Sequence, residues 1–143
     1  MFIDGDITKI ETGIITHQVN CKGVMGSGVA KSIRDKYPQI FKEYKKLCDA
    51  KGSDLLGSVD FVEINDSLVV ANVFGQDNFG YGEKFTDEDA LKQGLETVAE
   101  YSRVTGLDVY VPHGIGCVRA GGNWNKIQKK IKKLGFTIIR FKP

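Results

Sequence analysis

The 143-residue sequence is poor in the residues that build disulfide scaffolds and structural metal sites. It has three cysteines, Cys21, Cys48 and Cys117, and no two of them form a CxxC pair. With only two histidines, the chain also lacks a recognisable zinc-binding spacing. We therefore expect neither a disulfide framework nor a bound metal ion, and we expect no cofactor.

Long apolar stretches are also missing. No run approaches the roughly 18 residues that a transmembrane helix requires, and acids at positions 4 and 6 follow the first three residues without a basic segment. We therefore expect no membrane partner, no secretory signal and a cytoplasmic location. The 41% hydrophobic and 27% charged residues are typical of a globular domain. We expect residues 1–143 to form a single domain and a monomer.

Acidic residues are absent from one end of the chain. Residues 119–143 contain eight of the 20 Lys and Arg residues and none of the 18 acids. Because Ile127, Ile131 and Leu134 recur at helical spacing, the lysines around them are expected on the solvated face of an amphipathic helix. An anion-binding surface is the alternative interpretation, and nucleic acid is the least expected partner.

Short apolar runs alternate with helical patterns along the whole chain. The strands are expected at residues 1–3, 13–19, 59–64, 68–74, 109–111 and 136–141. The helices are expected from Gly28, from Pro38 to near Gly52, from a cap at 86–89 to before Gly106, and over 125–134. The almost wholly apolar run 68–74 predicts a strand covered on both faces. This pattern predicts an α/β fold, a three-layer α/β/α sandwich with a central mixed β-sheet.

Two glycine-rich loops each precede a predicted helix. They span residues 20–28 and 114–122, and neither has the spacing of a P-loop or of the GxGxxG dinucleotide motif. Glycine lets backbone N–H groups approach an anion, and the start of a helix adds the positive end of its dipole. Two such loops favour a diphosphate ligand, the alternative being tight turns that only require positive φ.

Four segments together resemble the macro domain family: GDIT at 5–8, VNCKGVMGSGVAKSI at 19–33, ANVFGQDNFG at 71–80 and PHGIGCVRAGGNW at 112–124. They occur in the family's order and span nearly the whole chain. The stretch at 42–57, KEYKKLCDAKGSDLLG, is similar to a stand-alone branch of ADP-ribose 1''-phosphate phosphatases. The resemblance implies a protein that binds ADP-ribose and hydrolyses ADP-ribose 1''-phosphate. An ADP-ribosyl hydrolase acting on protein or nucleic acid and a non-catalytic ADP-ribose-binding module are the alternatives.

The resemblance also implies which residues bind the ligand. Asp6, beside Ile7, would accept a hydrogen bond from the adenine amino group, unless it only caps a turn. Asn20 would bind the distal ribose, unless it only closes an Asx-turn. The two loops would clamp the diphosphate and distal ribose through Gly26, Ser27, Gly28 and Val29 on one side and Gly114, Ile115, Gly116, Cys117 and Val118 on the other.

Candidates for catalysis are few. His17 precedes Asn20 on the same strand and can act as a general base that titrates near pH 6 to 7, with Asn20 positioning the substrate. A buried histidine without a catalytic role is an equal alternative. Cys21 is expected to be a packing residue, and Lys22 is expected near the terminal phosphate. His113 and Asp77 are lower-ranked candidates in loops. Phe74 and Phe79 are expected in the core, the alternative being an aromatic wall of the pocket.

The second loop departs from the family pattern. Where relatives commonly read GCGLAGGDW, this chain has Val118, Arg119 and Asn123 in place of glycine, leucine and aspartate. Val118 adds bulk next to the expected phosphate path, and Arg119 adds a cation. Because the missing acid is one candidate for activating water, the sequence supports ligand binding better than turnover.

Overall fold

The computed structural model describes residues 1–80, 83–118 and 120–142. Its strands are β1 (Phe2–Asp4), β2 (Gly13–Asn20), β3 (Val59–Asn65), β4 (Leu68–Gln76), β5 (Val109–Pro112) and β6 (Thr137–Arg140). Its helices are α1 (Gly28–Lys36), α2 (Pro38–Lys51), α3 (Glu88–Thr105) and α4 (Trp124–Lys133), with short 3-10 turns η1 (Ile7–Lys9) and η2 (Gly52–Leu55). All ten predicted strands and helices are present, with ends within a few residues of those predicted.

The strands of the described chain form one six-stranded sheet in the order β1-β6-β5-β2-β4-β3. All neighbouring strands are parallel except β3, which is antiparallel to β4. A two-residue turn joins β3 to β4, and such a short connection permits only antiparallel pairing. The predicted mixed sheet is therefore confirmed.

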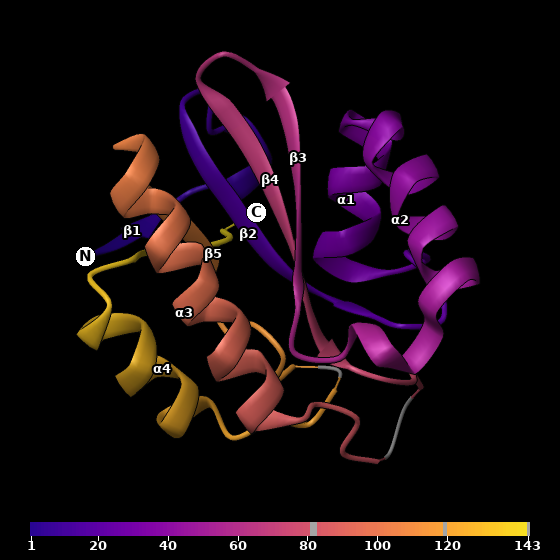
Figure 1. Cartoon of the computed structure of the whole chain (residues 1–143). Coiled ribbons are helices and arrows are strands. Elements are labelled where there is room, and N and C mark those ends of the chain that lie inside the picture. Colours follow the sequence, from indigo (N-terminus) through magenta and orange to yellow (C-terminus); the bar gives the residue numbers. More distant parts are fainter. Residues whose placement is uncertain (81–82, 119, 143) are drawn as a thin grey trace.

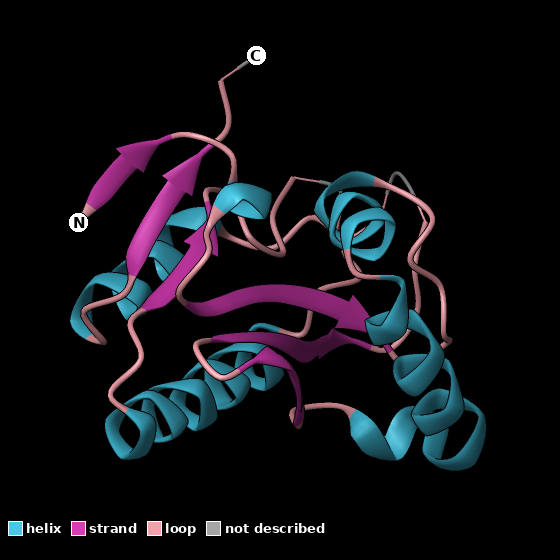
Figure 2. Cartoon of the chain, turned by 90° about the horizontal axis from the view of Figure 1, so that it is seen from above, coloured by secondary structure: helices cyan, strands magenta, loops and turns pink. Residues whose placement is uncertain are grey.

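Helices cover both faces of the sheet, as Figures 1 and 2 show. One face packs on α1 and α2, where Ile33, Ile40 and Tyr44 lie against Ile15 and other inward residues. The opposite face packs on α3 and α4 and forms a second core of aliphatic side chains. Because successive strand residues point to opposite faces, β4 contributes to both cores, which explains why residues 68–75 are all buried.

The helices begin and end at proline, glycine and capping residues of the sequence. Pro38 occupies the first turn of α2, and Gly52 caps its end. At the start of α3, the Asp87 carboxylate accepts a hydrogen bond from the N–H of Ala90, and Gly106 ends the helix in the left-handed conformation. These are the positions where the chain changes direction between layers.

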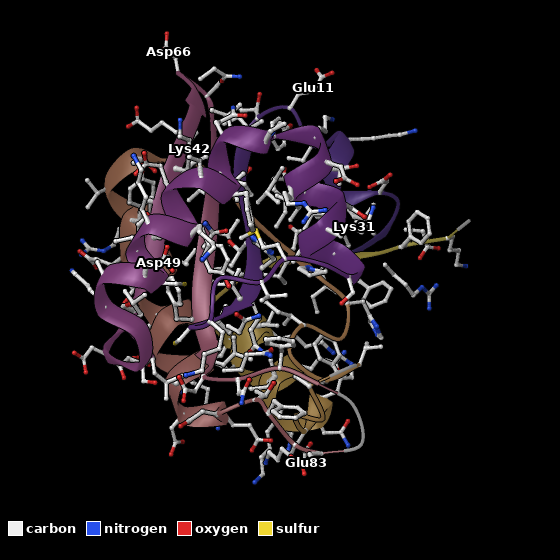
Figure 3. All side chains as sticks on the ribbon, turned by 90° about the vertical axis from the view of Figure 1, so that its right-hand side faces the viewer. Glu11, Lys31, Lys42, Asp49, Asp66 and Glu83 are labelled. Carbon is white, nitrogen blue, oxygen red and sulfur yellow. The ribbon has the colours of Figure 1, made fainter. Side chains whose placement is uncertain are left out.

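Helix α4 is amphipathic. Ile127 and Ile131 are fully buried, while Lys126, Lys129, Lys132 and Lys133 are exposed and Lys130 pairs with Glu96. The solvated basic face that the sequence predicts is therefore present. Charged side chains also point outward from the α1 and α2 layer, as Lys31, Lys42 and Asp49 show in Figure 3. Within the described part of the chain, no helix is both long and apolar enough to cross a membrane.

Candidate functional site

Two adjoining cavities lie at the carboxyl ends of the central parallel strands. The first has a volume of about 510 Å³ and the second about 570 Å³. Gly28, Val29, Pro112 and His113 line both of them. The cavities therefore form one elongated cleft that runs past the start of α1 and the loop after β5.

The first cavity has neutral walls. Besides the shared residues, its lining comes from β2, β4 and three loops: His17, Gln18, Val19, Asn20, Val24, Met25, Gly26, Ser27, Ala30, Gln76, Phe79, Gly80, Gly114, Ile115, Gly116, Cys117, Val118 and Ala120. None of these described lining residues is Asp, Glu, Lys or Arg. An anion in this cavity would therefore be held by backbone N–H groups and helix dipoles rather than by charged side chains.

The start of α1 supplies such donors. Ser27 is the N-cap residue, and its side chain makes no capping hydrogen bond. The N–H groups in the first turn of a helix have no partner within the helix. Those of Val29 and Ala30 also have no acceptor elsewhere among the described residues, so they are free to bind a ligand. Gly28, which lines both cavities, has a φ of +62°, a conformation that favours glycine.

The loop after β5 lines the same cavity and offers a second set of donors. Gly114 and Gly116 both have positive φ. Ile115 and Cys117 use their N–H groups in turns of the loop, whereas those of Gly114, Gly116 and Val118 have no acceptor within the described residues. Backbone N–H groups in a turn with left-handed glycines can form a concave anion-binding nest.

Asn20 holds its own loop together. Its Oδ1 accepts hydrogen bonds from the N–H groups of Lys22 (3.0 Å) and Val24 (3.3 Å) and from the hydroxyl of buried Tyr44 (2.8 Å). Its Nδ2 donates to the Val24 carbonyl at 2.8 Å. The Asx-type closure considered from the sequence is therefore present, and one Nδ2 hydrogen remains for a ligand.

Amide side chains connect the strand ends to the second loop. Gln18 Nε2 donates to Gln76 Oε1 at 2.6 Å and lies 2.9 Å from Thr86 Oγ1. The Thr86 hydroxyl in turn donates to the carbonyl of Gly116. This network fixes the position of the 114–118 loop relative to β2 and β4.

His17 lies in the wall of the first cavity but is only 1% exposed. Its Nε2 lies 2.6 Å from Asn72 Oδ1 on the neighbouring strand. Burial lowers the pKa of His17 to about 4, well below the value near 6 to 7 that the sequence suggests. The ring is therefore neutral at physiological pH.

Asp6 and Ile7 line the second cavity. Asp6 caps η1, because its Oδ1 accepts hydrogen bonds from the N–H (2.9 Å) and the hydroxyl (2.6 Å) of Thr8. Chiefly because of the bond from the Thr8 side chain, the pKa of Asp6 is lowered. Both bonds fall on Oδ1, and Oδ2 has no donor within the described residues. Phe141, which is 66% exposed, adds an aromatic ring to the same cavity.

The structure places all of the predicted ligand-binding residues along this one cleft. Asp6 and Ile7 lie in the second cavity, and Asn20, residues 26–29 and residues 114–118 lie in the first. Two weaker candidates, Phe79 and His113, also line the first cavity.

Other candidates lie elsewhere. Lys22 is 3.6 Å from Asp77, and neither residue lines a described cavity. Phe74 is fully buried in the core. Cys21 is also buried, and burial raises the pKa of its thiol to about 11, so it is no activated nucleophile. Arg119 lies outside the described residues.

Sequence reasoning missed several lining residues, including Gln18, Met25, Gln76 and Phe141. Two of them carry a signal that could have been used, since Gln18 lies two residues before Asn20 on β2 and Gln76 directly follows a buried run. Phe141 has none, because it reaches the cleft only through the pairing of β6 beside β1. Among the described residues, no cluster of three or more His, Cys, Asp or Glu side chains is placed to hold a metal ion.

No protein-family model matches the chain. Curated proteins of similar sequence carry the names of two different enzyme activities. A Saccharomyces cerevisiae ADP-ribose 1''-phosphate phosphatase is 32% identical over 107 residues, which cover 70% of this chain and 60% of the relative. A Mycobacterium tuberculosis DNA ADP-ribosyl glycohydrolase is 26% identical over 130 residues, which cover 89% of this chain and 36% of the relative. The chain thus spans between about a third and three fifths of the length of these curated relatives.

Solved structures show the same fold. The macrodomain of Thermus aquaticus DarG matches with a TM-score of 0.80 at 17% identity, and the match covers 99% of this chain and 97% of the DarG chain. Thermosipho africanus DarTG, solved in complex with ADP-ribose, matches with a TM-score of 0.74 at 19% identity, and the match covers 97% of this chain and 40% of the DarTG chain. These similarities show that the chain has the macrodomain fold. The four sequence motifs arranged around one cleft and the curated relatives named above support a place in the macro domain family.

Proposed function

We propose that the cleft binds ADP-ribose and that the protein hydrolyses ADP-ribose 1''-phosphate to ADP-ribose and phosphate. The observation that carries the proposal is the first cavity, where the start of α1 and the 114–118 loop both present free N–H groups. This cavity adjoins the second one at Gly28, Val29, Pro112 and His113. A diphosphate is the ligand whose two phosphates match two facing nests. The relatives named ADP-ribose 1''-phosphate phosphatase support this substrate.

The two ends of the cleft suit the two ends of this ligand. Asp6 can accept from an adenine amino group through the free Oδ2, and Phe141 and Ile7 provide apolar surface for the base. At the other end, the remaining Nδ2 hydrogen of Asn20 can donate to a ribose hydroxyl. The substrate would therefore lie with its 1''-phosphate toward the ends of β2 and β4.

Hydrolysis requires water to attack phosphorus while the bond from phosphorus to the C1'' oxygen breaks. In the proposed reaction, neutral His17 takes the proton from the attacking water, and the leaving oxygen of ADP-ribose takes up a proton from solvent water. The N–H nests stabilise the charge that develops on the phosphoryl group. The competing proposal is that Asn20 and the two loops act by positioning alone, with substrate phosphate or bulk water carrying the proton.

Phosphate release from ADP-ribose 1''-phosphate by the purified protein tests the reaction. We expect release that saturates with substrate and is inhibited by ADP-ribose, the product. A folded protein that binds ADP-ribose without releasing phosphate would instead be a binding module. The absence of charged side chains from the described walls of the first cavity favours that second candidate.

An ADP-ribosyl hydrolase acting on a modified macromolecule is a further candidate. It is supported by the longer alignment, which joins 89% of this chain to the named glycohydrolase. Release of ADP-ribose from ADP-ribosylated DNA or protein, measured beside phosphate release, separates the two activities. A monomeric state and a cytoplasmic location stay predictions.

A further inference from the structure

A row of polar side chains, two buried and one half-buried, crosses three strands next to the first cavity. His17 on β2 is in register with Asn72 on β4, and Asn72 is in register with Asp60 on β3. All three lie on the face of the sheet that packs on α2. His17 and Asn72 are 1% and 0% exposed, and Asp60 is half-buried.

The hydrogen bonds of this row have a direction. Asn72 Nδ2 donates to Asp60 Oδ2 at 3.5 Å, and Asn72 Oδ1 faces His17 Nε2 at 2.6 Å. An amide oxygen is only an acceptor, so the proton in the short contact must be on Nε2 of the histidine. A neutral imidazole carries one proton, which leaves Nδ1 as a bare acceptor.

Asp60 is the group that selects this direction. An ionised carboxylate accepts hydrogen bonds and donates none, so it draws the Nδ2 of Asn72 toward itself and turns Oδ1 toward His17. The reversed amide would place Oδ1 against the carboxylate. Of the charged groups on α2, Glu43 acts on Asp60, and it raises the pKa of that carboxyl as a smaller contribution than burial does.

The remaining nitrogen of His17 has no partner. Nδ1 is buried and makes no hydrogen bond within the described residues, although the ring forms part of the cavity wall. Buried acceptors without a partner are rare in native proteins. The residue that carries it lines the cavity that would hold the distal ribose and the 1''-phosphate.

We infer that Asp60 and Asn72 are positioning residues that hold His17 in the Nε2–H tautomer, so that Nδ1 is the nitrogen that accepts a proton or hydrogen bond from the cavity. The tautomer follows from the contacts that Asn72 makes with His17 and Asp60. Its use in turnover rests on the proposed phosphatase function. The chain thus prepares a neutral base through residues that do not touch the substrate.

Nitrogen-15 NMR of the imidazole tests the tautomer directly. We expect His17 of the wild-type protein to carry its proton on Nε2, and Asp60→Asn to give a mixture of the two tautomers because a neutral amide no longer dictates the orientation of Asn72. Asp66→Asn is the matched control, since Asp66 lies in the exposed β3–β4 turn and points to solvent (Figure 3). Asn72→Ala, which removes the acceptor itself, should also release the tautomer preference if the variant folds.

Turnover provides the second measurement. In Asp60→Asn, kcat should fall in proportion to the fraction of the Nε2–H tautomer, while affinity for ADP-ribose and the activity of Asp66→Asn stay at wild-type values. An Nδ1–H tautomer in the wild type, or a tautomer unchanged in Asp60→Asn, would overturn the inference whatever the activity. The predicted tautomers in a protein that does not release phosphate would leave the positioning intact and reject the phosphatase function.

Discussion

Gly26 is the position where the binding cleft can be blocked with least damage to the fold. It lines the first cavity between β2 and α1 and does not have a positive φ. A Cβ built there would meet only the Val24 side chain, at 3.9 Å, which is an ordinary contact. Gly26→Leu should therefore place a branched side chain beside the cleft without backbone strain.

The cost to ligand binding follows from the groups that the leucine would separate from the ligand. A hydrogen bond to a charged group contributes roughly 1.5–3 kcal/mol. If the leucine separates the diphosphate from two backbone N–H groups, the loss is about 3–6 kcal/mol, which corresponds to roughly 10²–10⁴-fold weaker binding. Gly26→Ala has the same backbone restriction but adds only one carbon, so its affinity should stay near the wild-type value.

Calorimetric titration with ADP-ribose and thermal unfolding together provide the assay. Replacing a glycine reduces the conformational entropy of the unfolded chain, and at a position without positive φ it does not strain the folded one. Both variants should therefore unfold at the wild-type temperature or slightly above it. If Gly26→Leu is folded and binds ADP-ribose as tightly as Gly26→Ala does, the diphosphate is not held between the two loops. The assignment of the first cavity would then be wrong.

Three further predictions concern other residues. Asp6→Ala should weaken ADP-ribose binding by about 1.5–3 kcal/mol while ribose 5-phosphate binding hardly changes, and an equal loss for both ligands in calorimetry would show that Asp6 only supports its loop. His17→Gln should keep ADP-ribose affinity and lower turnover by roughly 10²–10⁴-fold. The pH profile of kcat/KM should have an acidic limb near pH 4 in the wild type and lose it in the variant. A limb that persists in the variant would exclude His17 as the base. Since the pKa of His17 falls to about 4 on folding, the unfolded chain takes up this proton first, so the stability from the neutral ring is complete above about pH 6.5 and is lost as pH falls toward 4. That loss reaches about 3 kcal/mol, and denaturant titrations should show it in the wild type and not in His17→Gln.

Most of the fold was predictable because its local signals agree with its tertiary structure. Pro38, Gly52 and Gly106 mark helix ends, and the uninterrupted apolar run of β4 indicates a strand buried on both faces. The order of the strands was not predictable from periodicity, since it depends on which apolar faces pack together. The two 3-10 turns were also missed, because a single turn is too short to show a period.

The candidate site was predictable where backbone geometry defines it and less so where distant side chains meet. Glycines before α1 and after β5 identify the two loops without knowledge of the tertiary structure. Lys22 was expected near a terminal phosphate, but it lies beside Asp77, a pairing that only the tertiary structure shows. The environment of His17 depends on Asn72, 55 residues away along the chain, so its low pKa could not be predicted from neighbouring residues.

Calorimetric titration of the wild-type protein with ADP-ribose tests the central claim most directly. We predict saturable binding of one ligand per chain, with adenosine 5'-monophosphate and ribose 5-phosphate each binding more weakly because each fills only part of the cleft. A folded protein that shows no binding of ADP-ribose, or that binds it no better than these fragments, would contradict the assignment of the cleft.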